Sequence, residues 1–189
     1  MRSPIPILLA CACSTTQSGP RTTNAAAAAV AAATGPAATA QIEPRSGSTL
    51  TGTARFVEVS DGLGIHVELK GAPPGPHGIH VHEKGDCSDP GAASAGGHYN
   101  PTTAAHHGGP ATAVRHGGDL GNIEVDQNGN GVLDVVVPDL SVASVQNGVV
   151  GRAIVVHAGA DDLHSDPAGN SGARIGCGTI LAPPNQPSL

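Results

Sequence analysis

The spacing of apolar residues is the feature that most constrains what this chain can fold into. Apolar and polar residues alternate in short runs, and no segment keeps the 3.6-residue period of an amphipathic helix. Turn-forming residues are frequent, with 27 Gly and 16 Pro among 189 residues. The pattern favours an all-β domain over a helical one.

Eight segments are predicted to be strands, of which the first is weak: 40–43, 50–59, 65–69, 78–82, 123–125, 132–137, 149–157 and 177–181. Eight short strands in one domain are typical of a sandwich or a Greek-key barrel. Two long connections remain, Glu83 to Gly121 and Ala158 to Gly176, and loops of this length usually carry function. We therefore expect an eight-stranded Greek-key β-barrel or sandwich with two long functional loops.

The composition limits both the core and the partners. One Phe, one Tyr and no Trp leave Val, Ile, Leu and Ala to build the core. The formal net charge of −6 argues against nucleic acid as a partner. Ten histidines stand out against this background, and most of them lie in or beside the two long connections.

The first residues are expected to lie outside the domain. A charged start and a short apolar stretch predict a signal peptide at 1–10, although it is short for one and far below the roughly 20 residues of a membrane span. The run from Leu8 to Cys11 resembles the lipobox of bacterial lipoproteins, which makes Cys11 the expected lipidation site. Cys13 is a poorer second candidate, and an ordinary cleaved signal with incidental cysteines is the alternative.

Residues 11–38 are expected to follow as a lipidated Cys and a tether rich in Ala, Thr and Pro. The nearly pure Ala stretch at 25–33 allows a short helix, but it offers little apolar surface to hold one. About 25 flexible residues would reach roughly 25–30 Å. The domain itself is expected at 39–189.

Histidine spacing carries the chemistry. His80 and His82 alternate along one predicted strand, so their imidazoles lie on the same face, and His157 ends a later strand. In the first long connection His98, His107 and His116 are nine residues apart, and Asp119 follows at i+3. Three His and a carboxylate suit a closed zinc site, whereas an all-imidazole site suits copper.

Six segments, taken in order, resemble the signatures of the copper/zinc superoxide dismutases: 75–87 (GPHGIHVHEKGDC), 96–101 (GGHYNP), 107–110 (HGGP), 115–122 (RHGGDLGN), 151–162 (GRAIVVHAGADD) and 169–178 (GNSGARIGCG). The resemblance covers roughly Thr39 to Ala182. It implies an eight-stranded Greek-key barrel. It also implies dismutation of superoxide to oxygen and hydrogen peroxide by redox cycling of a histidine-ligated copper next to a structural zinc.

The resemblance also implies roles for single residues. The copper ligands would be His80, His82, His98 and His157, and the zinc ligands would be His98, His107, His116 and Asp119. His98 would bridge the two metals and carry a proton to the product, and Asp161 would link ligands of the two metals. Arg174 would attract and hydrogen-bond the anionic substrate. His77 would be structural, and His66, His106 and His164 are expected at the surface.

Cys87 and Cys177 match the positions that the family joins by a disulfide, which helps to place Arg174. A loop of about 90 residues would contribute roughly 4–5 kcal/mol in the chain-entropy model. Such a bond needs an oxidising compartment. We therefore expect an exported, bacterial-type enzyme of the cell envelope, lipid-anchored on the extracytoplasmic side, that protects against external superoxide. The oligomeric state stays open, a homodimer included.

The net negative charge of the chain repels an anionic substrate. Any attraction of superoxide must therefore come from positive charges close to the site. The second long connection carries three Asp but only Arg174 as a fixed cation. We expect weak steering, or steering from Lys84 or Arg115. Three rivals are a copper-delivery protein, a copper-only dismutase and a metal-buffering envelope protein. All four expected copper ligands are present, which argues against a copper-delivery protein. All four expected zinc ligands are present, which argues against a copper-only dismutase. Arg174 argues against a metal-buffering protein.

Overall fold

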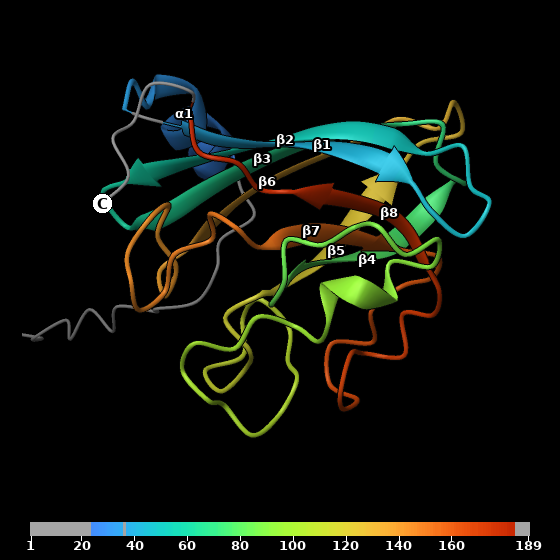
Figure 1. Ribbon diagram of the computed structural model, residues 1–189. Helices are drawn as coiled ribbons and strands as arrows, with labels where there is room; N and C mark the ends of the chain where they lie inside the picture. The colour runs from blue at the N-terminus through green and yellow to red at the C-terminus, as the bar shows by residue number, and fades with distance from the viewer. Residues whose placement is uncertain (1–23, 36, 184–189) are drawn as a thin grey trace, which may run out of the picture.

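The computed structural model describes residues 24–35 and 37–183 and is an antiparallel, closed eight-stranded barrel (Figure 1). The strands follow the order β1-β2-β3-β6-β5-β4-β7-β8 around it, and β8 pairs with β1. Their bounds are β1 (Ala37–Pro44), β2 (Thr51–Val59), β3 (Gly62–Lys70), β4 (Gly75–His82), β5 (Asp119–Val125), β6 (Gly131–Val137), β7 (Ala153–His157) and β8 (Arg174–Thr179). The expected eight-stranded β-barrel is confirmed.

The connections follow a Greek key, because β4, β5 and β6 pair in sequence while β3 lies beside β6. The hydrophobic core consists of aliphatic side chains and two aromatic ones, Phe56 and Tyr99. Ile79 and Val81 of β4 point into this core. The alternate residues of β4, His80 and His82, therefore lie on its outer face.

Every strand differs from its predicted bounds by at least one residue, and β7 and β8 show two of the causes. The segment 149–152 is a turn in which the Arg152 amide donates to the Val149 carbonyl at 3.0 Å, so β7 begins only at Ala153. An apolar run alone does not reveal this turn. β8 begins at Arg174 rather than Cys177, because Arg174 already pairs with His157 of β7.

The two long loops, 83–118 and 158–173, lie together over the outer face of β4 and β7 (Figure 1). Every residue of 77–82 is buried as a result, since the core covers one face and the loops cover the other. The first loop contains the one-turn helix η1 (Ala93–Ala95) and is joined to β8 by the Cys87–Cys177 disulfide. The disulfide expected from the resemblance is present.

A short helix, α1 (Asn24–Ala32), packs on the outside of β2, β3 and β6, away from the two long loops (Figure 1). Val30 of α1 is buried against Gly64, and Arg55 donates to the carbonyls of Val30 and Ala33 at 2.9 and 3.1 Å. The short helix that the Ala-rich stretch allows is therefore present, and it packs on the barrel. The barrel also begins at Ala37, two residues before the expected 39–189 domain.

In the part of the chain that the structure describes, none of the helices has the length and apolar character needed to cross a membrane. Cys11, Cys13 and the expected signal peptide lie outside the described residues.

Candidate metal centre

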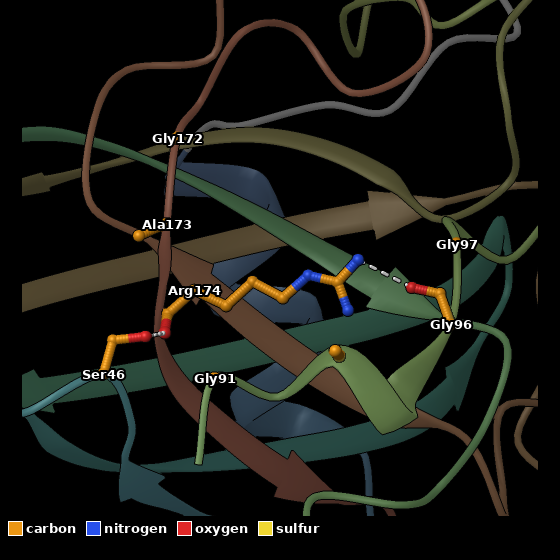
Figure 2. A pocket seen from close by; sticks show the side chains of 8 residues that line it. Ser46, Gly91, Gly96, Gly97, Gly172, Ala173 and Arg174 are labelled. Carbon is orange, nitrogen blue, oxygen red and sulfur yellow. Dashed lines mark hydrogen bonds between the residues drawn. The ribbon is translucent and has the colours of Figure 1, made fainter. Parts of the chain in front are cut away.

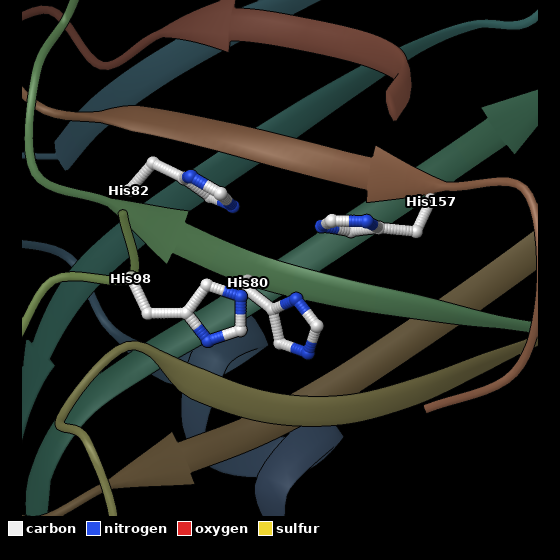
Figure 3. A group of neighbouring side chains, drawn as sticks. All are labelled: His80, His82, His98 and His157. Carbon is white, nitrogen blue, oxygen red and sulfur yellow. The ribbon is translucent and has the colours of Figure 1, made fainter. Parts of the chain in front are cut away.

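Four histidines gather on the outer face of the barrel at β4 and β7 (Figure 3). His80 and His82 come from β4 and His157 from the end of β7. His98 is brought beside β4 by a bridge to His82 and by the hydrogen bond from the Tyr99 amide to the Val81 carbonyl at 2.8 Å. One nitrogen from each imidazole lies within 4.8 Å of the others.

In this set, which we call the copper set, the second nitrogen of three rings already has an acceptor. His82 Nδ1 donates to the Gly96 carbonyl at 3.0 Å, and His157 Nδ1 donates to the Gly172 carbonyl at 3.2 Å. His80 Nε2 donates to the Asp161 carboxylate at 2.8 Å. These bonds fix the tautomers, so that each remaining nitrogen presents a lone pair to the centre of the set.

A second set, which we call the zinc set, contains His98, His107, His116 and Asp119. Asp119 Oδ2 accepts from the amides of Gly108 and His116, both at 3.0 Å, so Oδ1 faces the three rings. The Nδ1 atoms of His98, His107 and His116 lie 2.7, 3.0 and 3.4 Å from Oδ1. Because His98 offers Nε2 to one set and Nδ1 to the other, the two sets share this ring.

Asp161 connects the two sets. One of its carboxylate oxygens accepts from His80 Nε2 at 2.8 Å and the other from His107 Nε2 at 2.9 Å. The amide of Leu163 also donates to this carboxylate at 2.7 Å. Asp161 therefore orients one ring of each set, and the grouping of His80, His107 and Asp161 is a hydrogen-bonded link between them.

Unsatisfied buried nitrogens test whether metals fit here. Among the described residues, the buried side-chain nitrogens without a hydrogen-bond partner are Arg115 Nε and one nitrogen from each of six histidines: His80, His82, His98, His107, His116 and His157. Leaving such groups unpaired costs about 1–3 kcal/mol each, so a site of this kind needs a ligand. Four nitrogens suit copper, and three nitrogens with a carboxylate oxygen suit zinc.

The electrostatics of the copper set also favour metal binding. Burial lowers the pKa of His82 to about 2, of His80 to about 3 and of His157 to about 4. These imidazoles are therefore neutral at pH 7, which is the form that binds a metal. In the zinc set, burial opposes ionisation of Asp119, but its contacts with His107 and His98 outweigh burial and hold its pKa well below the usual range.

Arg174 lines a surface cavity of about 550 Å³ (Figure 2), and it pairs with His157 of the copper set where β8 meets β7. Its guanidinium donates to the carbonyls of Ala92 and Gly96, each at 2.7 Å. Arg174 is the one charged residue among those that line the cavity: Ser46, Gly91, Ala93, Gly96, Gly97, Gly172, Ala173 and Arg174. The arrangement offers a fixed positive charge to an anion that enters.

Other residues singled out in the sequence lie outside both sets. The ring nitrogens of His77 lie 2.8 and 2.7 Å from the carbonyls of His157 and Pro73, a structural arrangement. His106 and His164 are exposed, while His66 is half-buried and pairs with Asp134. Arg115 is 5% exposed and contacts Asp139 at 3.2 Å, so it does not present a free cation to solvent. Lys84 is exposed.

Comparison with known proteins agrees with this geometry. Residues 50–180 match the family model for copper/zinc superoxide dismutase (SODC). The chain belongs to the copper/zinc superoxide dismutase family. It is 39% identical over 134 residues to superoxide dismutase [Cu-Zn] 2 of Aquifex aeolicus, which covers 68% of this chain and 78% of that protein. This dismutase is thus an oxidoreductase with copper and zinc as cofactors, and its reaction is superoxide dismutation.

Two further known proteins are similar to the dismutase. It is 38% identical over 138 residues to an extracellular superoxide dismutase [Cu-Zn] of Drosophila melanogaster, covering 68% of this chain and 74% of that one. The crystal structure of a double mutant of a SOD-like protein from Bacillus subtilis superposes with a TM-score of 0.67 at 38% identity. That match covers 76% of this chain and 96% of the other.

Backbone groups complete the site of the dismutase, and the sequence reasoning missed them. The carbonyls of Gly96 and Gly172 orient ligand rings, and the Gly108 amide orients Asp119. Glycines stand beside histidines in the matching segments, which was the available signal. A glycine, however, does not disclose which way its carbonyl or amide points.

Proposed function

We propose that His80, His82, His98 and His157 hold copper and that His98, His107, His116 and Asp119 hold zinc. The observation that carries this assignment is the set of unpartnered buried imidazole nitrogens, one from each of these six histidines. When bound, copper supplies one-electron oxidation and reduction of superoxide, and zinc holds its four ligands in place. Asp161 keeps His80 and His107 in the tautomers that metal binding requires.

Arg174 and His98 act on the substrate and product in this proposal. The permanent charge of Arg174 binds the superoxide anion, and the two carbonyls that hold its guanidinium fix its direction. His98 Nε2 has no protein partner, and it lies in the copper set. Whenever this nitrogen is free of metal, it takes up a proton and delivers it to the departing peroxide.

We further propose that the enzyme is exported and protects the cell envelope from external superoxide. The disulfide supports an oxidising compartment, and a relative is named an extracellular enzyme. Residues 1–10 would be the signal peptide and Cys11 the lipid-bearing residue that ties the protein to the membrane. Mass spectrometry of the mature N-terminus tests this part: an unmodified start elsewhere than Cys11 would exclude the anchor.

Metal content and activity test the ligand assignment together. The wild-type protein is expected to bind one copper and one zinc, and to remove superoxide. His157→Ala should lose copper and activity while it keeps zinc, and Arg174→Ala should keep both metals with reduced activity. His164→Ala, an exposed histidine, is the matched control. Activity that survives the loss of His157 would show that the copper assignment is wrong.

The same experiment separates a dismutase from a copper-delivery protein. A delivery protein gives its copper to an acceptor and does not turn over superoxide. A fully loaded protein without dismutase activity would favour that second function.

A further inference from the structure

A tight turn after β1 lies against the segment that carries Arg174. Ser46 and Gly47 both have left-handed backbones, with φ of 52° and 75°. The Ser48 amide donates to the Arg45 carbonyl at 3.0 Å and closes the turn. The turn requires a left-handed backbone at both central residues, and glycine adopts it without cost whereas serine does not, so a serine at position 46 calls for an explanation beyond the turn.

One side of the turn binds the start of β8. The Ser46 hydroxyl donates to the Arg174 carbonyl at 2.9 Å, as Figure 2 shows. The Arg45 amide and the Ser48 hydroxyl both donate to the Ile175 carbonyl, at 2.9 and 2.6 Å. Three donors from four consecutive residues therefore fix the backbone from which the Arg174 side chain extends.

The other side of the turn binds the first long loop. The Ser46 amide donates to the Pro90 carbonyl at 2.8 Å, and Arg45 Nε donates to the Cys87 carbonyl at 2.9 Å. This loop also supplies the Ala92 and Gly96 carbonyls that hold the guanidinium of Arg174. The turn thus spans the same two segments that the Arg174 side chain spans.

We propose that the Arg45–Ser48 turn positions Arg174 for the substrate, with Ser46 as the principal positioning residue. The disulfide joins the loop and β8 at Cys177, three residues beyond Arg174, whereas the turn joins them at Arg174 itself. The hydroxyl of Ser46 explains why a serine occupies a backbone conformation suited to glycine. The inference rests on the proposed role of Arg174 in binding the superoxide anion.

The variant Ser46→Gly tests this directly, because it removes the hydroxyl and relieves the backbone at once. We expect kcat/KM to fall about three- to tenfold, a modest value for loosening a group that orients a substrate. The midpoint of thermal unfolding should stay unchanged or rise, because glycine tolerates the left-handed backbone. A merely structural role for Ser46 predicts the opposite combination, with lower stability and unchanged kcat/KM.

A readout independent of turnover follows the Arg174 side chain itself. Phenylglyoxal modifies arginine side chains, and peptide mapping gives the rate at Arg174. This rate should rise in Ser46→Gly in the metal-free as well as the loaded protein. Thr103→Gly is the matched control, since Thr103 is an exposed hydroxyl residue of the first long loop with a φ of 55°. It should change neither the modification rate nor kcat/KM.

Arg45 provides a second arm. Arg45→Gln removes the bond to the Cys87 carbonyl together with a charge, and Arg55→Gln removes an equal charge beside α1. Only Arg45→Gln should raise the modification rate of Arg174.

Two results separate failure of this inference from failure of the proposed function. If Arg174→Ala lowers kcat/KM but Ser46→Gly changes neither kcat/KM nor the modification rate, the turn does not position Arg174. If Arg174→Ala itself leaves kcat/KM unchanged, the role of Arg174 fails instead. In the Arg174→Ala background, Ser46→Gly should have no further effect on kcat/KM; a persisting effect would overturn the inference.

Discussion

Arg174 and His82 donate hydrogen bonds to the same acceptor, the carbonyl oxygen of Gly96, at 2.7 and 3.0 Å. One residue belongs to the copper set and the other lines the cavity beside it. A single peptide group thus sets the position of a metal-binding ring and of the cation proposed to bind the substrate. Movement of this peptide group is expected to displace both the His82 ring and the Arg174 guanidinium.

Gly96→Ala should therefore reduce copper affinity and kcat/KM together. Gly96 has a φ of 76°, which disfavours any side chain, and a Cβ there would crowd the side chain of Glu83. We expect copper affinity to fall about 10-fold or more, as for other partners that orient metal ligands. Copper competition with a chelator measures the affinity, and stopped-flow removal of superoxide measures kcat/KM.

Gly97→Ala is the control for that variant. A Cβ at Gly97 meets nothing within 4 Å, and the residue lies one position along the same loop. It should behave as wild type. Equal losses in the two variants would mean that the loop, rather than the Gly96 carbonyl, is what matters.

Gly169→Ala is expected to lower the affinity for both metals, because Gly169 packs directly on Asp161. A Cβ there would overlap the Asp161 carboxylate and lie 2.8 Å from His107 Nε2, and the φ of 63° adds strain. The displaced carboxylate would release His80 and His107, one ring of each set. Loss of metal by dialysis against a chelator should show about 10- to 100-fold weaker binding of copper and zinc. Gly159→Ala, where a Cβ makes only ordinary contact, serves for comparison, and loss of one metal alone would contradict the linking role of Asp161.

Gly64→Ala should loosen α1 without affecting catalysis. A Cβ at Gly64 would lie 2.7 Å from a methyl group of Val30, and overpacking of this kind costs roughly 1–3 kcal/mol. Hydrogen exchange of residues 24–32 should become faster and the thermal midpoint should fall by a few degrees. The metal sets belong to β4, β5, β7 and the long loops, so kcat/KM should stay the same. Gly35→Ala, placed in open space after the helix, should leave both measurements unaltered; unchanged exchange in Gly64→Ala would argue against the packing described for Val30.

The sequence predicts the barrel well because alternation along each strand is a local property. Ile79 and Val81 face the core, so His80 and His82 had to share the outer face. The nine-residue spacing of His98, His107 and His116 in the first loop likewise identifies a ligand set before any fold is known. The start of β7 was missed, because the turn hydrogen bond between Arg152 and Val149 leaves no mark in an apolar run. The start of β8 was missed, because it depends on the pairing of Arg174 with His157 of another strand.

The features that could not be predicted from the sequence depend on contacts between distant segments. The Ala-rich helix could not be predicted to dock, because its binding site is formed by Gly64 and Arg55 on two neighbouring strands. Arg115 looked like a free cation in sequence, yet its partner Asp139 lies 24 residues away. Every residue has a backbone carbonyl, so the sequence does not show that the Gly96 carbonyl is a hydrogen-bond acceptor in the site.

Electrostatic attraction of superoxide should be weak over long distances in this enzyme. Arg174 is the one charged residue that lines the cavity, the loop at 158–173 carries three Asp, and Arg115 is buried. Raising the ionic strength from about 0.01 M to about 0.15 M shortens the screening length from about 30 Å to about 8 Å. We expect kcat/KM to fall by no more than about threefold over this range, because only the short-range field of Arg174 attracts the anion. Lys84→Gln, which removes the exposed cation after β4, shows whether that residue contributes, and Lys70→Gln at the end of β3 is its charge-matched control. A steep fall of kcat/KM with salt in the wild-type enzyme that Lys84→Gln abolishes would instead assign the steering to Lys84.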